Sequence, residues 1–545
     1  MAKPVQEQRT LDIKNRTAHD KDHATWSRRS FLQTLGLAGG VGLTMGGFGL
    51  EALASAPLSL MSNGDVNNRI LVLIRLKGGN DGLNMIVPVY DYSRYKNNRP
   101  TIALAHNDLI SLDNDGRFAM PKTMTKLKSL WDNGKMKVIN SVGYPDHNLS
   151  HFTSSDIWNS ANQDIESDAD KSGWLGRYLL NRNPDYLANL PEVPGAIKVS
   201  SGSSIAYQTP DRIDLAVNFN TPDKLIEVAQ KGFIYDTDNL PDDCYYGDQV
   251  GYLRSILNIT YKYAPVISQA YGAGSNAVAY SNNELSRQLA IVARLIKGNL
   301  GTRLYMVTLD GFDTHENQNI NHPRLMNDIS AAISEFYADL EAGDKDGDVL
   351  SMTFSEFGRR VRENEGGTDH GTAAPVMFFG PALESNGFLG KNPDLGDLDN
   401  NGNLKHGVDF RSVYATILES WLCIEASAVD DVLGNVYDRL PDLGLQCTGV
   451  FAEQVSLNQK IRHGVRNMAD GSQVIWYEIA RPGVVVVDVH TILGQKITTL
   501  VNAYQDQGQH EAVFINQHAG LSAAMYVYSI RSGQAGVSGK FFVGG

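Results

Sequence analysis

Acidic, histidine and hydroxyl side chains gather in five short stretches of the sequence, each next to a run of apolar residues. In chain order the stretches contain Asn80 and Asp81; His147, Ser150, His151 and Thr153; Asp310, Asp313 and His315; Glu356 and Arg359; and Asp369 and His370. Carboxylates and imidazoles without thiolates are ligands that suit zinc, manganese, magnesium or calcium. A divalent cation of this kind can neutralise a phosphate or sulfate ester, activate a hydroxyl nucleophile and hold the leaving oxygen.

The apolar runs have the length of buried strands, and helical patterns lie between them. The runs cover 69–76, 137–143, 303–309, 348–355 and 374–380, and the helical periodicity is clearest at 284–297 and 324–343. This alternation predicts an α/β domain over about 65–445, with a mostly parallel sheet sandwiched by helices. Ligands of open α/β sheets bind at the carboxyl ends of the strands, so we expect the five polar stretches to converge in space.

Each polar stretch also has an ordinary structural interpretation. Ser150 and Asp313 are good helix-capping residues, and Asp81 followed by glycine is a common turn. Glu356 and Arg359 have the spacing of a surface ion pair. Ser150 also precedes a predicted helix, whose unpaired N–H groups favour an anionic group of a substrate. The conjunction of the five stretches favours a metal-dependent site over five unrelated local features.

Several long strings of the sequence resemble one bacterial family, catalogued as domain of unknown function 1501. The strings are LKGGNDGLNMIVP, SHFTSSDIW, GWLGRYL, GFDTHENQ, TFSEFGRRVRENEGGTDHGTAAPVMFFG and DFRSVYATILESWL, between about residues 68 and 425. That family is grouped with the alkaline phosphatase-like superfamily of phosphatases, sulfatases and phosphodiesterases. The resemblance implies an alkaline phosphatase-like α/β fold with a hydrolytic centre of one or two metal ions.

The resemblance also implies roles for individual residues. The metal ligands it implies are Asp81, Asp313, His315, Glu356 and His370, with Asp369 as a further ligand or as the group that orients a histidine. The nucleophile is Ser150 or, as the alternative, Thr153, and the substrate-binding residues are Asn80, His151 and Arg359.

Two alignments are open for the superfamily's adjacent Asp-His pair. It corresponds either to Asp369-His370 or to Glu356-Phe357, and strand order favours the second. Phe357 then replaces a metal-binding histidine, which predicts a centre with one ion or one that has lost turnover.

The two ends of the chain carry targeting patterns. Residues 1–56 contain Arg28 and Arg29, a short glycine-rich apolar stretch and a final Ala54-Ser55-Ala56, which are typical of a twin-arginine export signal. The pattern of residues 471–545 predicts short strands of a small β-sandwich. These residues resemble the C-terminal sorting domain of type IX secretion cargo, and residues 446–470 are predicted to be a linker. We therefore expect the export and type IX machineries as partners, and a secreted or surface-attached protein without a transmembrane span in the mature chain.

The net charge and the number of cysteines exclude some classes of function. The 545 residues carry a formal net charge of −13, which argues against a nucleic-acid surface. The three cysteines are too few for a disulfide framework but leave room for one bridge in an oxidising compartment. The sequence therefore predicts a metal-dependent hydrolase acting on an anionic phosphate or sulfate ester. The alternative is a non-catalytic surface protein that binds an anionic glycan or a protein partner in the same cleft.

Overall fold

The computed structural model describes most of the chain between residues 68 and 543. The described ranges are 68–222 with gaps at 167–169, 185, 187–188, 201–203 and 211; 245–447; and 461–543 with gaps at 469–471, 480–482, 492–495, 516–523 and 533–534. The predicted signal at 1–56, Cys244 and the final Gly544-Gly545 lie outside them. Within them, no helix combines the length and the apolar character that crossing a membrane requires.

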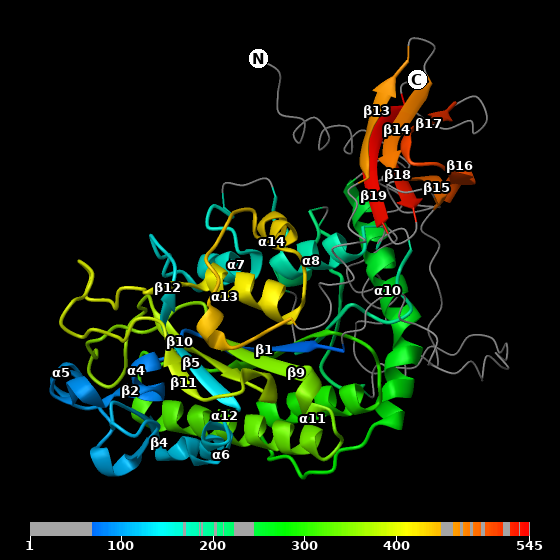
Figure 1. Ribbon diagram of the computed structural model, residues 1–545. Coiled ribbons are helices and arrows are strands. Elements are labelled where there is room, and N and C mark those ends of the chain that lie inside the picture. Colours follow the sequence, from blue (N-terminus) through cyan, green and yellow to red (C-terminus); the bar gives the residue numbers. More distant parts are fainter. Residues whose placement is uncertain are drawn as a thin grey trace, which may run out of the picture. The chain divides into compact units, whose positions relative to one another are not determined.

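A nine-stranded sheet forms the centre of the α/β domain (Figure 1). Its strands are β1 (Ile70–Lys77), β5 (Met136–Gly143), β6 (Ala196–Val199), β7 (Ala216–Phe219), β8 (Leu304–Asp310), β9 (Val349–Phe354), β10 (Ala374–Phe379), β11 (Gly387–Leu389) and β12 (Val408–Asp409). Their order is β11-β5-β10-β9-β1-β8-β6-β7, with β12 also on β5. Every pairing is parallel except the two that β10 makes, with β5 and β9. The expected mostly parallel sheet is confirmed, and all five predicted runs are strands of it.

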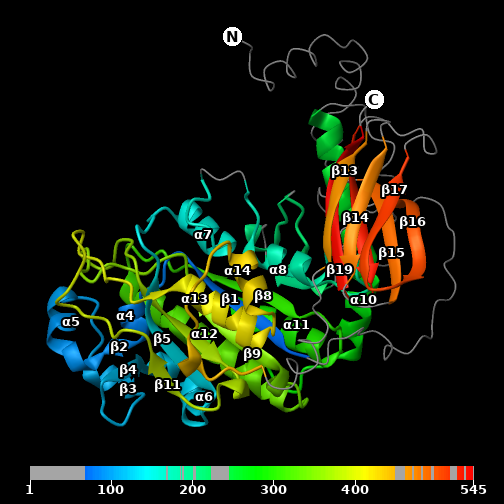
Figure 2. The same ribbon diagram turned by 45° about the horizontal axis from the view of Figure 1, so that its top comes forward.

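Helices cover both faces of this sheet. The helices described for this part of the chain are α4 (Gly82–Met85), α5 (Tyr92–Asn98), α6 (Lys128–Asp132), α7 (His151–Ser160), α8 (Trp174–Arg182), α10 (Tyr245–Ala273), α11 (Glu284–Lys297), α12 (Gln318–Glu341), α13 (Phe410–Thr416) and α14 (Ala426–Leu433). Helices α11 and α12 lie on one face and α7, α8 and α13 on the other (Figures 1 and 2). Strand β1 supplies side chains to both cores, because Val72 and Ile74 pack with α11 and α12 while Leu71 and Leu73 pack with α7 and α8. Burial on both faces explains its continuous apolar sequence.

Two predicted helices match the structure to different degrees. Helix α11 has the predicted bounds, and Asn283 caps it by accepting a hydrogen bond from the Ser286 N–H at 2.8 Å. Helix α12 begins at Gln318 rather than 324, so Pro323 lies inside it. The predicted range began at 324 because the apolar periodicity starts with Leu325, whereas the helix continues back through Pro323, which has no N–H to donate to the preceding turn.

The described residues between 160 and 222 contribute strands and a helix to the α/β domain. Strands β6 and β7 extend the central sheet beyond β8, and α8 packs on the same face as α7. Strands β6 and β7 are only four residues long, which explains why the alternation of strands and helices was not predicted in this part of the sequence.

Two small features stabilise the rest of the α/β domain. Strands β2 (Val87–Pro88), β4 (Phe118–Pro121) and β3 (Leu109–Ser111) form a separate antiparallel sheet, which is followed by a short 3-10 segment, η4 (Lys122–Leu127). A disulfide bond joins Cys423 to Cys447, with their Cα atoms 5.7 Å apart. The single bridge that the cysteine count left room for is therefore present.

The C-terminal residues form separate antiparallel sheets, as expected. One sheet has the order β13-β14-β17 and the other β16-β15-β18-β19, and they share one apolar core. The strands are β13 (Arg462–Asn467), β14 (Gln473–Ile479), β15 (Gly483–Thr491), β16 (Lys496–Gln505), β17 (Gly508–Phe514), β18 (Ala524–Ser532) and β19 (Ala535–Val543). Strand β13 corrects the predicted linker, because it lies inside 446–470 and pairs with β14. The sequence of β13, RHGVRN, is mostly polar, so the sequence pattern did not predict a strand there.

Candidate metal centre

Glycines after β1 allow three loops to approach one another at the carboxyl ends of the strands. Gly78 and Gly79 both have positive φ angles, of 120° and 82°. A Cβ atom on Gly78 would lie 2.4 Å from the backbone N of Asp313, and one on Gly79 would lie 2.3 Å from the Phe357 ring. Only glycine fits at these two positions, so the paired glycines of the LKGGNDG string bring the loops after β1, β8 and β9 together.

Glycines in the turn around His370 also allow a close approach between two backbone segments. A Cβ on Gly367 would lie 2.1 Å from the carbonyl oxygen of His315, and one on Gly371 would lie 2.4 Å from the carbonyl carbon of Arg359. The turn between β9 and β10 therefore packs directly on the backbone that carries His315. This contact places His370 beside a residue 55 positions earlier in the chain.

The buried side chain of Arg359 links these loops through hydrogen bonds. The Arg359 guanidinium donates hydrogen bonds to the carbonyls of Gly79 at 2.8 Å, Thr368 at 2.7 Å and Phe312 at 3.0 Å. It also donates to Asp313 Oδ1 at 2.6 Å. The predicted role of Arg359 in substrate binding is corrected, because the side chain is buried and its donors are used inside the protein. Arg359 positions the loops of the site.

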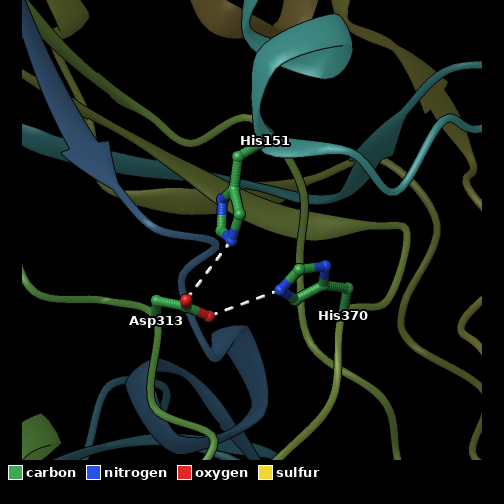
Figure 3. A group of neighbouring side chains, drawn as sticks. All are labelled: His151, Asp313 and His370. Carbon is green, nitrogen blue, oxygen red and sulfur yellow. Dashed lines mark hydrogen bonds and ion pairs between the residues drawn. The ribbon is translucent and has the colours of Figure 1, made fainter.

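Four side chains lie close together next to Arg359, namely Asp313, His151, His315 and His370. The Nε2 atoms of His315 and His370 lie 3.0 Å apart, and they lie 3.1 Å and 3.3 Å from Oδ1 of Asp313. The other Asp313 oxygen, Oδ2, lies 3.4 Å from Nε2 of His151 (Figure 3). Predicted ligands Asp313, His315 and His370 are thus brought together. His151 was predicted to bind substrate, but the structure places it with this group.

The spacing of these atoms fits a coordinated cation. Two ligands at about 2.0–2.1 Å from a tetrahedral zinc ion are separated from each other by roughly 3.3 Å. The triangle formed by His315, His370 and Asp313 has edges of 3.0, 3.1 and 3.3 Å, so an ion can contact all three atoms. His151, Asp313 and His370 also form a set whose ligand atoms all lie within 4.8 Å of one another. Three imidazoles and one carboxylate suit zinc best among the predicted ions.

Two carboxylates support the histidines from behind. His151 Nδ1 lies 3.0 Å from Glu356 Oε1, and this hydrogen bond raises the pKa of His151. His315 Nδ1 lies 3.3 Å from Asp369 Oδ1. Carboxylates in this position orient metal-binding histidines and increase their basicity. The contact of Asp369 with His315 is the one that its second predicted role, orienting a histidine, requires, and that role stays a prediction. The Glu356 oxygen that contacts His151 also lies behind the imidazole rather than beside Asp313.

The protonation of the central residues favours cation binding. Burial acts to raise the pKa of Asp313, but the hydrogen bond and charge of Arg359 outweigh burial and hold that pKa below its usual value. Burial lowers the pKa of His370, which favours the neutral imidazole. Its Nδ1 lies 2.8 Å from the Leu149 carbonyl, so Nδ1 carries the proton and Nε2 presents a lone pair.

Phe357 lies among the histidines. Its ring centroid is 4.5 Å from that of His370 and 4.9 Å from that of His151. Phe357 is buried and offers no ligand atom. On this side of the site an apolar ring stands where the alignment places a second metal-binding histidine.

Asp81 forms an ion pair inside the protein. It is fully buried, and its Oδ2 accepts hydrogen bonds from Gln318 and, at 2.6 Å, from Arg99. Burial acts to raise the pKa of Asp81, but the charge and hydrogen bond of Arg99 outweigh it and the net shift is downward. Arg99 is thus the counter-charge of Asp81 in this structure, while the other carboxylate oxygen, Oδ1, is buried and has no hydrogen-bond partner among the described residues. Sequence reasoning missed Arg99 because it lies in an unremarkable stretch after α5.

Asn80 is also buried inside the protein. Its backbone N–H donates to Ser355 Oγ at 3.0 Å, and its Oδ1 lies 3.2 Å from Nε2 of His322. These contacts occupy the side chain that was predicted to bind substrate. Asn80 therefore belongs to the support of the site, like Asp81 and Arg359.

Replacing Arg99 with methionine is expected to destabilise the protein strongly. Both partners of its ion pair have at most 1% of their side-chain surface exposed, so the substitution leaves an uncompensated buried carboxylate. Removing one partner of a buried pair typically costs about 3–5 kcal/mol of unfolding free energy. Denaturant unfolding with Lys77→Met as the control measures it, because the Lys77–Asp310 pair is about half exposed and such pairs contribute ~0–1 kcal/mol. Equal, small losses in both variants would contradict the assignment.

The two candidate nucleophiles face different surroundings. Ser150 is the exposed N-cap residue of α7, and its side chain makes no capping hydrogen bond. Its chain neighbours both contact the site, since Leu149 binds His370 and His151 approaches Asp313. Thr153 instead donates its hydroxyl to Glu166 at 2.7 Å. The structure therefore favours Ser150 over Thr153 at the edge of the metal centre.

His147 does not join His151 despite their spacing of four residues. Helix α7 begins only at His151, so the two rings do not share a helical face. His147 instead stacks on Tyr144, and its Nδ1 lies 3.0 Å from the Tyr144 carbonyl.

The fold and the site together define an α/β protein with a candidate divalent-metal centre at the carboxyl ends of its parallel strands. Residues 264–433 match a family model described as protein of unknown function (DUF1501), a range that includes Asp313, His315, Glu356 and His370. No curated protein matches the chain significantly.

Several solved structures are similar to this chain at low sequence identity. The lipoteichoic acid synthase LtaP from Listeria monocytogenes is 9% identical, with 82% of this chain and 87% of that chain covered and a TM-score of 0.33. The PsFucS1 sulfatase from Pseudoalteromonas sp. is 9% identical over 83% and 84% of the two chains, with a TM-score of 0.30. Alkaline phosphatase from the Antarctic bacterium TAB5 is 10% identical over 59% and 95%, with a TM-score of 0.26. At TM-scores this low the likeness carries no functional information, which has to come from the site.

Proposed function

We propose that this protein is a metal-dependent hydrolase of phosphate or sulfate esters. The observation that supports this most is the triangle of His315 Nε2, His370 Nε2 and Asp313 Oδ1, with edges of 3.0–3.3 Å. His151 approaches the same aspartate from the start of α7. A divalent cation held there supplies Lewis acidity toward an ester oxygen and charge neutralisation.

The chain's own groups support the rest of this chemistry. The first N–H groups of α7 have no partner inside the helix, so they favour an anionic ester group beside Ser150. The Ser150 hydroxyl is the nucleophile in this proposal: it gives its proton to water as its oxygen bonds to phosphorus or sulfur and the bond to the leaving alkoxide breaks. The alkoxide takes up a proton from solvent, and a water molecule then hydrolyses the seryl ester, which releases phosphate or sulfate and restores Ser150. His151 is the nearest imidazole in the chain, and its contact with Glu356 keeps the ring oriented toward the site.

The alternative is a non-catalytic surface protein that binds an anionic glycan or a protein partner, and it has specific support. Asp81 is neutralised by Arg99, and Phe357 stands among the histidines without a ligand atom. Both features argue for one ion rather than two. A single ion bound without turnover would serve to recognise an anion.

Metal analysis and an activity assay on the exported protein decide between the two. Elemental analysis is expected to find about one divalent ion per chain, and p-nitrophenyl phosphate or p-nitrophenyl sulfate is expected to be hydrolysed with loss of activity on chelation. Bound metal with no turnover of either ester would favour the binding protein. Absence of bound metal after native export would contradict both.

We also propose that the protein acts outside the cytoplasm, either secreted or attached to the cell surface by the type IX machinery. The Cys423–Cys447 bond supports an oxidising compartment, where disulfides persist. The twin arginines and the C-terminal resemblance are the sequence support for this localisation.

Changing Arg28 and Arg29 together to lysine is expected to block export. Uncleaved precursor should accumulate in the cytoplasm, because the export machinery reads the arginine pair. Cell fractionation with mass measurement of the N-terminus checks it, and the double change Arg9→Lys and Arg16→Lys in the same leader is the control. Normal processing of the twin-arginine variant would show that another route exports the chain.

A further inference from the structure

The outer face of the C-terminal sheet β13-β14-β17 carries a tryptophan on its middle strand. Side chains along a strand point alternately to the two faces of its sheet, and Ile475 and Tyr477 of β14 pack in the apolar core. Trp476 therefore points outward, and its side chain is partly exposed. The residues directly opposite it, Gly464 on β13 and Glu511 on β17, share this face, so the indole lies at its centre.

Gly464 leaves room for the indole to extend over the neighbouring strand. A Cβ atom at this position would lie 2.7 Å from Nε1 of Trp476 and 2.9 Å from its Cε2 and Cζ2. Any residue other than glycine would therefore displace the ring. The neighbouring strand is about 4.8 Å away, so a ring that reaches it is inclined along the sheet and turns one of its broad sides toward solvent.

Two exposed ion pairs lie on opposite sides of the indole. Arg466 Nη2 lies 2.7 Å from Glu511 Oε1, and Arg462 Nη1 lies 3.9 Å from Glu478 Oε2. On β13 the two arginines stand one on each side of the position opposite Trp476. All four charged side chains have at least 50% of their surface exposed, so a ligand on the indole can reach them.

These groups match the chemistry of a neutral carbohydrate. A sugar ring with equatorial hydroxyls has apolar C–H faces that can stack on an aromatic ring, and hydroxyls at its rim that both donate and accept hydrogen bonds. Each ion pair offers N–H donors on the arginine and acceptors on the glutamate. The two arginines and two glutamates have no net charge, so this face gives no advantage to an anionic or a cationic ligand.

The apolar surface continues beyond the indole. Val513 on β17 points to the same face and is 50% exposed, and Met468 and Ile515, each about half exposed, follow the ends of β13 and β17. Successive outward residues of one strand are about 7 Å apart. The face is therefore long enough for several linked sugar rings rather than one.

The exposed ion pairs favour a carbohydrate over a protein surface as the partner. In a protein interface these four charged groups would lose their water, and that cost roughly cancels the attraction within each pair. The hydroxyls of a glycan replace the lost water with hydrogen bonds of the same kind, so the charged groups keep their partners.

We propose that this face of the C-terminal sheet binds a neutral oligosaccharide, with Trp476 as the stacking surface. The Arg466–Glu511 and Arg462–Glu478 pairs bind its hydroxyl groups. The inference is independent of the proposed hydrolysis, because none of these residues belongs to the candidate metal centre.

Titration calorimetry of the full-length protein with cellohexaose tests the proposal, because its β-linked glucose rings have equatorial hydroxyls and flat apolar faces. The unmodified protein is expected to bind it one to one. Trp476→Ala removes the stacking surface and is expected to weaken binding at least about tenfold. Tyr504→Ala is the control with unchanged affinity, because it removes an exposed aromatic ring from β16 in the other sheet.

A second variant separates binding from the stability of the sheet. An aromatic ring that covers a glycine of a neighbouring strand also stabilises strand pairing, so Trp476→Ala changes both properties. Glu511→Ala leaves the indole and its contact with Gly464 in place but removes an exposed acceptor. It is expected to weaken binding about fivefold, with thermal unfolding close to that of the unmodified protein.

The same titration with a chelator, and with His370→Ala, is expected to give an unchanged affinity. Loss of binding under either condition would place the glycan at the metal centre and overturn the proposal. Equal affinity of the Trp476→Ala and unmodified proteins, or no binding of cellohexaose at about 5 mM, would overturn it as well. Sedimentation that shows a dimer turning into a monomer in Trp476→Ala would mean that a second copy of the chain covers this face instead.

Discussion

Replacing His370 with alanine is expected to remove the bound metal and with it the ester hydrolysis. His370 Nε2 forms two of the three edges of the ligand triangle, with His315 and with Asp313, so its loss leaves two ligands on one side. Loss of even an outer partner of a metal ligand typically costs about 10- to 100-fold in affinity or activity, and loss of a ligand should cost at least that. Elemental analysis and the p-nitrophenyl ester assay on the same preparation measure the two effects together.

A second histidine variant controls for this substitution. His106→Ala changes an exposed histidine that stacks on Tyr92 and takes no part in the metal centre. Metal content and activity of that variant should match the unmodified protein. Full metal occupancy in the His370 variant would mean that the triangle is only a hydrogen-bonded cluster, and the proposed function would then fail.

Replacing Ser150 with alanine is expected to abolish turnover while the metal stays bound. The Ser150 side chain is exposed and uncapped at the start of α7, and it is not one of the metal-site ligands. Loss of a nucleophile is expected to lower kcat by about a thousandfold or more. Steady-state kinetics and metal content on one preparation check the prediction.

Thr153→Ala is the matched control for the serine variant. It removes a hydroxyl from the same helix, but that hydroxyl is bound to Glu166. Its kcat should change by no more than about twofold. If Thr153→Ala abolished turnover and Ser150→Ala did not, the two hydroxyls would have been assigned the wrong way round.

These two variants together also separate the two candidate functions. A hydrolase loses activity in both, and only the His370 variant loses metal. A binding protein has no activity to lose, but it loses affinity for sulfate or phosphate groups when the metal is removed. Phe357, which lies against His151 and His370, makes this comparison informative, because its ring offers no ligand atom on that side of the site.

The stability of the site rests on groups that the reaction does not use. Arg359 holds the loops after β1, β8 and β9 through backbone carbonyls, and Arg99 neutralises Asp81 beneath them. The two arginines pre-organise the loops that carry the histidines and Asp313. A site held in this way binds a cation at a smaller cost in chain ordering than one built on mobile loops.

The sequence alone determined which segments meet. Apolar runs of strand length predicted the parallel strands, and parallel strands end at one edge of a sheet, so residues from 151 to 370 were expected at one place. The glycines at 78, 79, 367 and 371 also follow from that meeting, because the backbones there approach more closely than a Cβ atom allows. Local pattern and connectivity were sufficient for these conclusions.

Only the tertiary structure decided what each side chain contacts. Asp81 and Asp313 are both acids that follow a strand, yet Asp81 pairs with Arg99 and Asp313 faces three histidines. Likewise His151 faces the centre, while Thr153 on the same helix points to Glu166. Partners of this kind are set by the helical register and by packing between distant segments, and neither is encoded in the type of a residue or in its immediate neighbours. The sequence therefore identifies an acid at a strand end as a candidate metal ligand, but it does not show which positive group will neutralise that acid.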